Sequence, residues 1–450
     1  MSARYALDLP DGPRRRLAVG WLLLALASLV ASGVFSVLLV LSRAPWTKDV
    51  FPLVDFFHVA LVVHVDLSVL VWFAAFAGVF WSLNSTPRLA DAGWVALGLA
   101  VGGAAVMSVA PFTGRGGPIM ANYVPVLDDP VFLAGLVIFA AGGVVLVARS
   151  MAAVPPVGTR IDGPGALRFG LNAAVVSAAV ALIAFAWSWL EVPPALDGKA
   201  YYELLFWGGG HVLQFTWTLL MFVAWLWLAD ACGARVPLTP RVAVLLFGIA
   251  LASVFLTPVI YLAYDVASVE HHRWQTWLMR FGAGLAILPF ALALVVALAR
   301  RGVPEARARP LYAALVASLV LFGVGGVIGA MIHGSNVKIP AHYHGSIVGI
   351  TLAFMGLTYH LLPALGFGEP APRAAGWQPW IYGGGQLLHV IGLVWSGGYG
   401  VQRKVAGASQ ALRSTEEVAA MGLMGLGGLI AVAGGLMFLV IVLRAMLRSP

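Results

Sequence analysis

The chain of 450 residues is 61% apolar and only 10% charged, whereas a soluble domain is roughly half apolar and a quarter charged. This composition excludes a soluble enzyme and a disordered chain, and the single cysteine, Cys232, excludes a disulfide scaffold, an attached c-type haem and a cysteine-bridged copper or iron–sulfur centre. The net charge of +8 does not indicate nucleic-acid binding, because membrane proteins distribute their basic residues for topology.

Twelve apolar stretches are long enough to cross a bilayer, which takes about 20 residues. The first follows Arg14, Arg15 and Arg16 without a cleavage-type small-residue site, so it reads as an anchor. The stretches cover 17–42, 54–83, 92–112, 130–149, 167–190, 202–229, 241–267, 275–299, 311–333, 341–365, 377–397 and 418–446. We predict an all-α, polytopic membrane protein with 12 transmembrane helices and a single domain over 1–450.

The basic residues predict the orientation of these helices. With the N-terminus inside, 17 of the 27 Lys and Arg residues lie in or beside inner segments, nine lie on outer ones, and Arg280 is left within a span. Because inner loops of membrane proteins are rich in Lys and Arg, both termini are predicted to be cytoplasmic. The protein is expected in the cytoplasmic membrane of a bacterium or archaeon, with the lipid bilayer as its surroundings.

Most of the ten histidines share one predicted depth, in the outer half of the membrane. Ionisable groups are costly inside a bilayer, so this grouping indicates function rather than packing. The residues are His58, His64, His211, His271, His272, His333, His342 and His344.

The spacing of the histidines indicates two kinds of site. At 100° per residue, His342 and His344 project about 200° apart, which suits two large planar groups on opposite sides of one helix. His271 and His272 project about 100° apart and can converge on one ion at a helix end. His211 on a third helix would complete a three-imidazole site of the kind that suits iron, copper or zinc.

Six of these histidines resemble those of the catalytic subunit of the haem-copper oxidase superfamily, which includes oxygen reductases and nitric oxide reductases. The segment VVHVDLSVLVWFAAFAGVFW resembles the low-spin haem segment, FWGGGHVLQFTW the segment of the first non-haem metal ligand, and EHHRWQTW the double histidine. The segment IPAHYHGSIVGITLAFMGLTYHLLP most resembles the corresponding helix of the B-type branch of this superfamily. The resemblance covers the whole chain, and it implies a subunit I-like bundle.

The resemblance also implies a set of cofactors and ligands. Two haems, of b-type, would be present: a low-spin haem between His64 and His344, and a high-spin haem on His342. A non-haem metal, iron or copper, would be held by His211, His271 and His272. Arg403, Lys404 and His333 resemble the residues near the haem propionates.

Two observations distinguish nitric oxide from oxygen as the substrate. Oxygen reductases of this superfamily usually place a tyrosine four residues after the first metal ligand, where this chain has Phe215. Another branch places the tyrosine on the next helix; Tyr264, seven residues before His271, keeps that alternative open, and Tyr261 lies three residues earlier. The inner halves of 202–229, 241–267 and 275–299 carry few polar residues, so a pumping track from the cytoplasm is not expected.

Acidic residues gather instead near the outer face. Glu203 and Glu270 are the candidate proton donors, and Glu191 and Asp265 lie nearby. Gln214, three residues after His211, could supply an oxygen ligand to the metal, hydrogen-bond bound nitric oxide, or only join two helices. An added oxygen ligand would favour iron, whereas a pure imidazole site would favour copper.

The sequence therefore predicts the catalytic subunit of a respiratory nitric oxide reductase of denitrification, which couples two molecules of this small gas to N2O and water without pumping. Electrons would come from a partner subunit, a cytochrome c or a cupredoxin or CuA-like protein. The alternatives are a terminal oxygen reductase, as cytochrome c or quinol oxidase subunit I, a 12-helix secondary transporter, and a non-catalytic haem-binding subunit.

Overall fold

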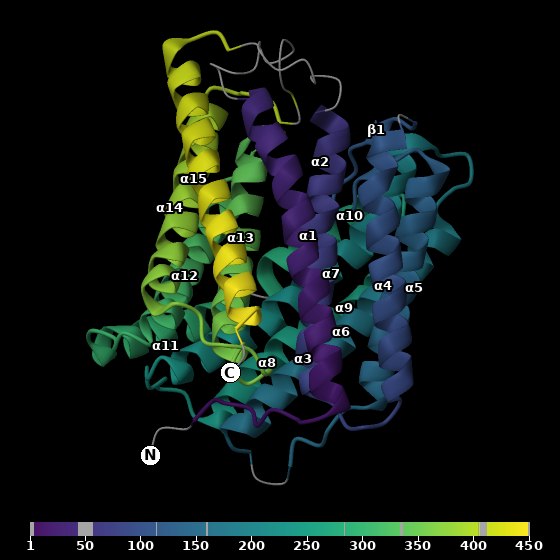
Figure 1. Cartoon of the computed structure of the whole chain (residues 1–450). Helices are drawn as coiled ribbons and strands as arrows, with labels where there is room; N and C mark the ends of the chain where they lie inside the picture. Colours follow the sequence, from purple (N-terminus) through teal and green to yellow (C-terminus); the bar gives the residue numbers. More distant parts are fainter. Residues whose placement is uncertain are drawn as a thin grey trace. The chain divides into compact units, whose positions relative to one another are not determined.

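The structure is a computed structural model that describes residues 4–43, 57–113, 115–158, 161–282, 284–333, 336–403, 405 and 412–448. It is mostly helical, as predicted. The helices are α1 Pro13–Arg43, α2 Phe57–Val65, α3 Trp72–Leu83, α4 Ala90–Val109, α5 Pro130–Ala152, α6 Gly163–Glu191, α7 Gly198–Ala231, α8 Pro240–Val254, α9 Leu256–Ala263, α10 Val269–Trp277, α11 Gly284–Arg301, α12 Arg309–Ala330, α13 Lys338–Leu361, α14 Pro372–Gly398 and α15 Thr415–Met446 (Figure 1).

Short irregular elements join some of these helices. Two π-helical segments, η1 Asp66–Val71 and η3 Leu278–Gly282, continue α2 into α3 and connect α10 with α11. A 3-10 turn, η2 Ala110–Thr113, ends α4. The strands β1 Pro118–Ile119 and β2 Val126–Leu127 pair antiparallel in the connection from α4 to α5.

A helix covers each of the twelve predicted stretches. Ten helical runs in the described part are long and apolar enough to cross a membrane. The two remaining stretches form α13 and α14, which carry more polar residues, among them His342 and His344 on α13 and Gln386 on α14. Twelve spans thus remain a prediction, and ten meet the apolar criterion.

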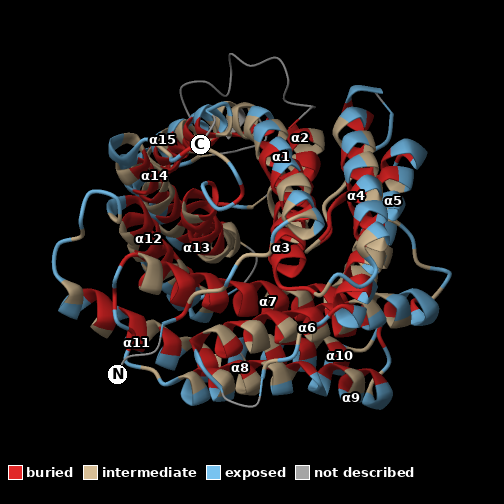
Figure 2. Cartoon of the chain, turned by 60° about the horizontal axis from the view of Figure 1, so that its bottom comes forward, coloured by how far each residue is buried: buried red, intermediate tan, exposed pale blue. Residues whose placement is uncertain are grey.

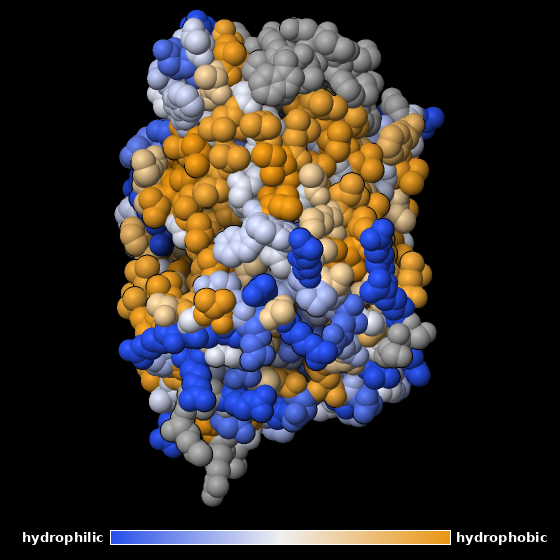
Figure 3. All heavy atoms as spheres, turned by 60° about the vertical axis from the view of Figure 1, so that its left-hand side comes forward, coloured by the Kyte–Doolittle hydropathy of each residue, from blue (hydrophilic) through white to orange (hydrophobic). Residues whose placement is uncertain are grey.

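Apolar side chains cover the outside of these helices. Leu190, Leu262 and Leu288 are 76%, 76% and 73% exposed, although large aliphatic side chains are normally buried in soluble proteins. On the face drawn in Figure 3, apolar residues form a broad continuous zone, and hydrophilic residues gather toward one end. This distribution is that of a multi-pass membrane protein.

The chain divides into two compact units, and unit 1 comprises Met1–Ser28 and Val65–Gly302. Within it, α4 lies beside α5 and α6 beside α7 (Figure 1). The backbones approach closely where a side chain is missing: a Cβ atom on Gly103 of α4 would collide with the Phe139 backbone of α5. Helix α7 is the most buried of the described spans, and most of its residues from Gly208 to Ala229 are buried (Figure 2).

Unit 2 comprises Leu29–His64 and Val303–Pro450. Its helices pair through glycines, as is common in membranes, where small residues let backbones approach. Gly325 of α12 faces Gly345 of α13, and Gly392 of α14 faces the backbone of Met424 on α15. These contacts fix α13, the helix that carries two of the predicted haem ligands, against its neighbours.

Candidate metal and haem sites

Three consecutive glycines precede His211 on α7, and each leaves room for an aromatic ring from another element of unit 1. A Cβ atom on Gly208 would strike Tyr261, one on Gly209 would strike Phe185, and one on Gly210 would strike Tyr123. Glycine is otherwise unfavourable inside a helix, by about 1 kcal/mol relative to alanine. The three glycines of the run WGGGH therefore lower the helix propensity of this segment, but they allow three aromatic rings to pack closely around the predicted metal ligand.

His211 is buried, and its imidazole is held by two partners. Its Nδ1 lies 2.7 Å from the main-chain oxygen of Trp207, one turn earlier on α7. The Tyr123 hydroxyl lies 2.9 Å from Nδ1 and 3.0 Å from Nε2. A ligating histidine generally has its second ring nitrogen bonded to a carbonyl or a comparable acceptor, which fixes the ring, and the Trp207 carbonyl is placed for this role.

Trp207 connects His211 with His272. The Trp207 ring centroid lies 4.7 Å from each of the two imidazole centroids, and the indole Nε1 donates to the His272 main-chain oxygen at 3.4 Å. The Nδ1 atom of His272 in turn lies 3.4 Å from the Ser268 carbonyl oxygen. One tryptophan thus joins the predicted ligands of α7 and α10.

The double histidine lies at the beginning of α10, in the run that continues into α11. The reason is local: Ser268 caps α10, and its hydroxyl accepts from the His271 N–H at 3.1 Å. Such a cap fixes where a helix begins. The two histidines therefore occupy its first turn, and their ring centroids are 6.2 Å apart.

His271 fits the role of a metal ligand. It is completely buried, and neither ring nitrogen has a hydrogen-bond partner among the described residues. The same holds for the amide of Gln275, one turn later on α10. Buried polar atoms are nearly always satisfied, so these atoms are suited to a group that supplies the missing bonds. No sequence pattern indicated a role for Gln275, although it follows His271 by four residues and therefore lies one helical turn after it.

The three imidazoles do not meet at one point. Among the described residues, no group of three His, Cys, Asp or Glu side chains stands close enough to hold a metal ion. His211, His271 and His272 are nevertheless neighbours, because Trp207 packs against both His211 and His272 and the His271 and His272 ring centroids are 6.2 Å apart. The donor set fits a non-haem metal, and binding one would require these rings to turn toward one another.

Two tyrosines adjoin the predicted ligands, and neither is Tyr264. The Tyr261 ring packs edge-on against His271 at 4.7 Å, while its hydroxyl donates to the Ala184 carbonyl at 3.1 Å and lies 2.7 Å from the Ser188 hydroxyl. Tyr264 does not share a helical face with His271, because α9 ends at Ala263 and Tyr264 has an extended backbone.

Tyr123 is the functional candidate that sequence reasoning missed. Its backbone has φ = 67°, a left-handed conformation that is uncommon for a bulky residue and is often found at functional sites. The preceding Asn122 is tied down by Glu203, whose carboxylate accepts from the Asn122 N–H at 3.0 Å and from its side-chain amide. Glu203 therefore anchors the loop that brings Tyr123 to His211. Only the loop's own contacts reveal this, and no sequence motif signals it.

The three predicted haem ligands all belong to unit 2, and each has its Nδ1 bonded. The Nδ1 of His64 lies 3.1 Å from the Ser32 carbonyl oxygen and 3.0 Å from its hydroxyl. In His342, Nδ1 lies 2.7 Å from the Gly325 carbonyl oxygen. His344 has its Nδ1 3.2 Å from Gln386 Oε1. An imidazole that donates from Nδ1 presents the lone pair of Nε2, as an axial haem ligand requires, so these residues fit two haems.

Two further buried polar residues, one in each unit, have no role assigned above. His389 on α14, to which the sequence assigned no role, lies 4.6 Å from His344 between ring centroids, and its Nδ1 lies 2.9 Å from the Met424 carbonyl oxygen. In unit 1, Asp66 begins the π-helix η1, and neither of its carboxylate oxygens has a partner among the described residues. Such π-helical turns occur frequently at functional sites.

The remaining predicted site residues are more exposed. Gln214 is half-buried, and its main-chain oxygen accepts from the Thr218 hydroxyl at 2.8 Å. Glu270 and His333 are exposed, and Arg403 is half-buried in the turn after α14. Lys404 lies outside the described residues, so the propionate pair stays a prediction.

Comparisons with known proteins cover nearly the whole chain. Residues 16–437 match the family model of cytochrome c and quinol oxidase polypeptide I. An uncharacterized protein of Rickettsia prowazekii (strain Madrid E) is 27% identical over 494 residues, covering 94% of this chain and 95% of the relative. One of Aquifex aeolicus (strain VF5) is 28% identical over 359 residues, covering 78% and 85%. A heme-copper terminal oxidase dimer matches in structure, with a TM-score of 0.73, 17% identity, and coverage of 98% of this chain and 85% of that one.

Proposed function

The chain belongs to the cytochrome c and quinol oxidase polypeptide I family, and we propose that it is the catalytic subunit of a respiratory nitric oxide reductase. Because it belongs to this family, the chain is an oxidoreductase of the haem-copper oxidase superfamily and a multi-pass membrane protein. The proposed reaction joins two NO molecules with two electrons and two protons to give N2O and water.

The shortage of polar side chains along the described part of α7 below His211 carries this proposal. From His211 to Asp230, α7 has no ionisable side chain, and Phe215, in the position where many oxygen reductases have tyrosine, is buried in an apolar cluster with Val212 and Leu278. The nearby hydroxyls bond locally: Thr216 donates to Ser177 at 2.9 Å, and Ser177 to the Val212 carbonyl at 3.4 Å. Among the described residues, this chain of bonds ends at the Val212 carbonyl, so it supplies no route for pumped protons.

The chain's residues would hold the cofactors as the resemblance implies. His64 and His344 would hold the low-spin haem, His342 the high-spin haem, and His211, His271 and His272 the non-haem metal. When bound, the haems and the metal supply the electrons and bind the gas. The carbonyls of Ser32, Trp207 and Gly325 orient three of these imidazoles.

Protons are proposed to enter from the outer side through Glu203. Glu203, Trp207 and His211 follow one another at four-residue intervals on α7, so they share one face of the helix. Glu203 already holds the two Asn122 donors, which keeps its carboxylate beside the Tyr123 loop. Glu270 is exposed at the beginning of α10 and is the second candidate. The electron donor would be a partner subunit with cytochrome c or a cupredoxin or CuA-like centre, in a bacterial or archaeal cytoplasmic membrane.

A terminal oxygen reductase is the second candidate, and two tyrosines favour it. The Tyr123 hydroxyl lies on His211, and the Tyr261 ring lies on His271, so a phenol stands next to each of two predicted metal ligands. The Tyr261 hydroxyl, however, is engaged by α6 through Ser188 and Ala184. The role of Gln214 differs between the two candidates. In a nitric oxide reductase it would bind the metal or hydrogen-bond the bound NO, whereas in an oxygen reductase it would only join two helices.

The metal content of two variants tests the proposed site. The purified protein should show a Soret band and contain one non-haem metal, iron or copper, beyond two haems. His211→Ala should keep both haems but lose that metal and all NO reduction, since a trigonal imidazole site loses one of its three ligands. His360→Ala, a matched control in the last turn of α13 and outside the eight grouped histidines, should keep both haems and the metal. A protein without a Soret band, or an unchanged third metal in His211→Ala, would contradict the assignment.

A further inference from the structure

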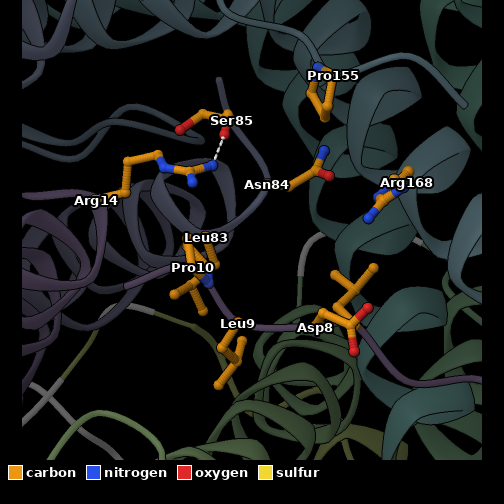
Figure 4. Close-up of a pocket in the computed structure, with 10 residues that line it drawn as sticks. Asp8, Leu9, Pro10, Arg14, Leu83, Asn84, Ser85, Pro155 and Arg168 are labelled. Atoms are coloured by element: carbon orange, nitrogen blue, oxygen red, sulfur yellow. Dashed lines mark hydrogen bonds between the residues drawn. The ribbon is translucent and has the colours of Figure 1, made fainter. Parts of the chain in front are cut away.

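A polar cavity of about 270 Å³ lies in unit 1, away from the predicted metal ligands, where the N-terminal segment meets the ends of three helices. Figure 4 shows its lining residues, which come from the N-terminal segment and the first turn of α1, the end of α3, the connection after α5 and the first turns of α6. Among them are Asp8, Arg14, Asn84, Ser85 and Arg168. Because these four helix ends lie together, the cavity is placed at one surface of the membrane.

Two guanidinium groups converge on Ser85 at the wall of this cavity. Arg14 donates to the Ser85 main-chain oxygen, as drawn in Figure 4. From below, Arg149 of α5 donates to the Ser85 hydroxyl at 3.1 Å and to the Trp81 carbonyl at 3.4 Å. Arg149 is only 2% exposed, and its Nε has no partner among the described residues. Full burial of an arginine normally requires that its charge and donors be paired.

These arginines have no acidic partner. Among the described residues, no carboxylate lies within 4.0 Å of the guanidinium of Arg14, Arg149 or Arg168, and the ion pairs present involve other arginines. Asp8 is the one acidic side chain lining the cavity, and it is exposed. Like charges brought together at the edge of a low-dielectric region repel one another. An anion in the cavity would remove this repulsion.

The opposite wall is fixed by amide hydrogen bonds. Asn84 donates from Nδ2 to Asn172 Oδ1 at 3.0 Å, and Asn172 donates to the Pro155 carbonyl at 3.3 Å. These bonds tie the end of α3 to α6 and to the connection after α5. The cavity is therefore a preformed site, with Arg14 on one side and, on the other, Arg168 and the braced Asn84 amide.

We propose that this cavity binds the phosphate group of an anionic ligand, supplied either by the headgroup of an anionic phospholipid or by a free phosphate. Guanidinium groups match phosphate oxygens in geometry and charge, and they form the stronger, charge-assisted class of hydrogen bond. Arg14 and Arg168 contact the ligand, whereas Arg149 supports it from below through Ser85. The volume admits a headgroup as well as a single phosphate.

Binding of three probes to the delipidated, haem-loaded, full-length chain tests the proposal. The probes are dihexanoylphosphatidylglycerol, inorganic phosphate and, as the uncharged match, dihexanoylglycerol; native mass spectrometry counts adducts, and thermal unfolding gives apparent Kd values. Arg14→Gln and Arg168→Gln should each weaken binding about tenfold, the loss of one charge-assisted contact. Arg16→Gln, an exposed neighbour of Arg14 that does not line the cavity, should bind like the unsubstituted protein.

The outcomes separate the two sources of phosphate. Tight binding of the phospholipid with weak binding of inorganic phosphate identifies a lipid site, and comparable binding of both identifies a free-phosphate site. Equal binding of dihexanoylglycerol, binding that is unchanged in both Arg14→Gln and Arg168→Gln, or no adduct with either phosphate probe would overturn the proposal. Variants are compared only where their Soret bands match the unsubstituted protein, so a folding defect is not read as lost binding.

Discussion

Main-chain carbonyl groups orient four of the six imidazoles in the predicted sites. In each of the four, Nδ1 lies within hydrogen-bond distance of a carbonyl oxygen, which selects the tautomer with a lone pair on Nε2 and limits rotation of the ring. The pairs are His64 with Ser32, His211 with Trp207, His272 with Ser268, and His342 with Gly325. His344 is held instead by the Gln386 side chain, and His271 has two buried ring nitrogens without a hydrogen-bond partner among the described residues, which a bound metal would satisfy.

Tyr123→Phe tests whether the loop hydroxyl positions His211. Outer-shell partners of metal ligands are typically worth 10- to 100-fold in metal affinity, so the variant should lose its non-haem metal to a chelator at about tenfold lower chelator concentration. The measurement is metal content after a chelator titration, with both haems monitored by their Soret absorbance. The haem spectrum should not change, because His64, His342 and His344 lie on other elements.

Tyr264→Phe is the matched control for this change, since Tyr264 follows the end of α9 and contacts none of the three predicted metal ligands through a hydrogen bond among the described residues. Its metal should resist chelator like that of the unsubstituted protein. Equal loss in both variants, or metal retention in Tyr123→Phe, would contradict a positioning role for Tyr123.

At the scale of single elements, α7 combines a rigid buried half with a glycine-rich half that makes room for the site. Residues 215–229 are almost all buried and apolar, whereas Gly208, Gly209 and Gly210 admit Tyr261, Phe185 and Tyr123. The helix thus supplies both the apolar segment below His211 and the space in which the three aromatic rings pack around it.

Gly210→Ala should destabilise the protein although alanine favours a helix. The added methyl group would collide with the Tyr123 ring, and overpacking of this kind costs about 1–3 kcal/mol. Gly98→Ala on α4, where a Cβ atom meets nothing within 4 Å, should be neutral or stabilising by up to about 1 kcal/mol. Thermal unfolding in detergent measures both. An unchanged melting temperature in Gly210→Ala would show that Tyr123 is not held against α7.

The sequence predicted the elements better than their contacts. Apolar length located a helix at every predicted stretch, because the bilayer sets the length of a span. The seven-residue spacing from Tyr264 to His271 did not place both residues on one helical face, since α9 ends one residue before Tyr264 and the Ser268 cap starts a new helix before His271. Tyr123, Gln275 and His389 were missed because loop trajectory and side-chain pairing depend on tertiary contacts that no local pattern encodes.

At the scale of the whole molecule, polar residues are distributed unevenly along the spans. The eight grouped histidines and the candidate carboxylates Glu203 and Glu270 lie near the predicted outer ends, while the hydroxyls described in the lower half of α7 form only local bonds. Under the proposed function, this distribution predicts turnover that takes protons from the outer side and neither pumps protons nor builds a membrane potential.

Proteoliposomes test the direction of proton uptake. With a reduced donor added only outside, NO turnover should make the external medium alkaline, and an uncoupler should leave the rate unchanged. A pH electrode and an NO electrode record both. Acidification of the medium that disappears with uncoupler would mean pumping, and the apolar segment below His211 would then have to contain a proton route.

Gas analysis tests the assignment of the substrate most directly. The purified protein, supplied with a reduced donor under anaerobic conditions, should convert NO to N2O at one N2O for every two NO consumed, as gas chromatography would record. His211→Ala should produce none. Sustained oxygen uptake by the unsubstituted protein, with no N2O formed from NO, would instead identify a terminal oxygen reductase.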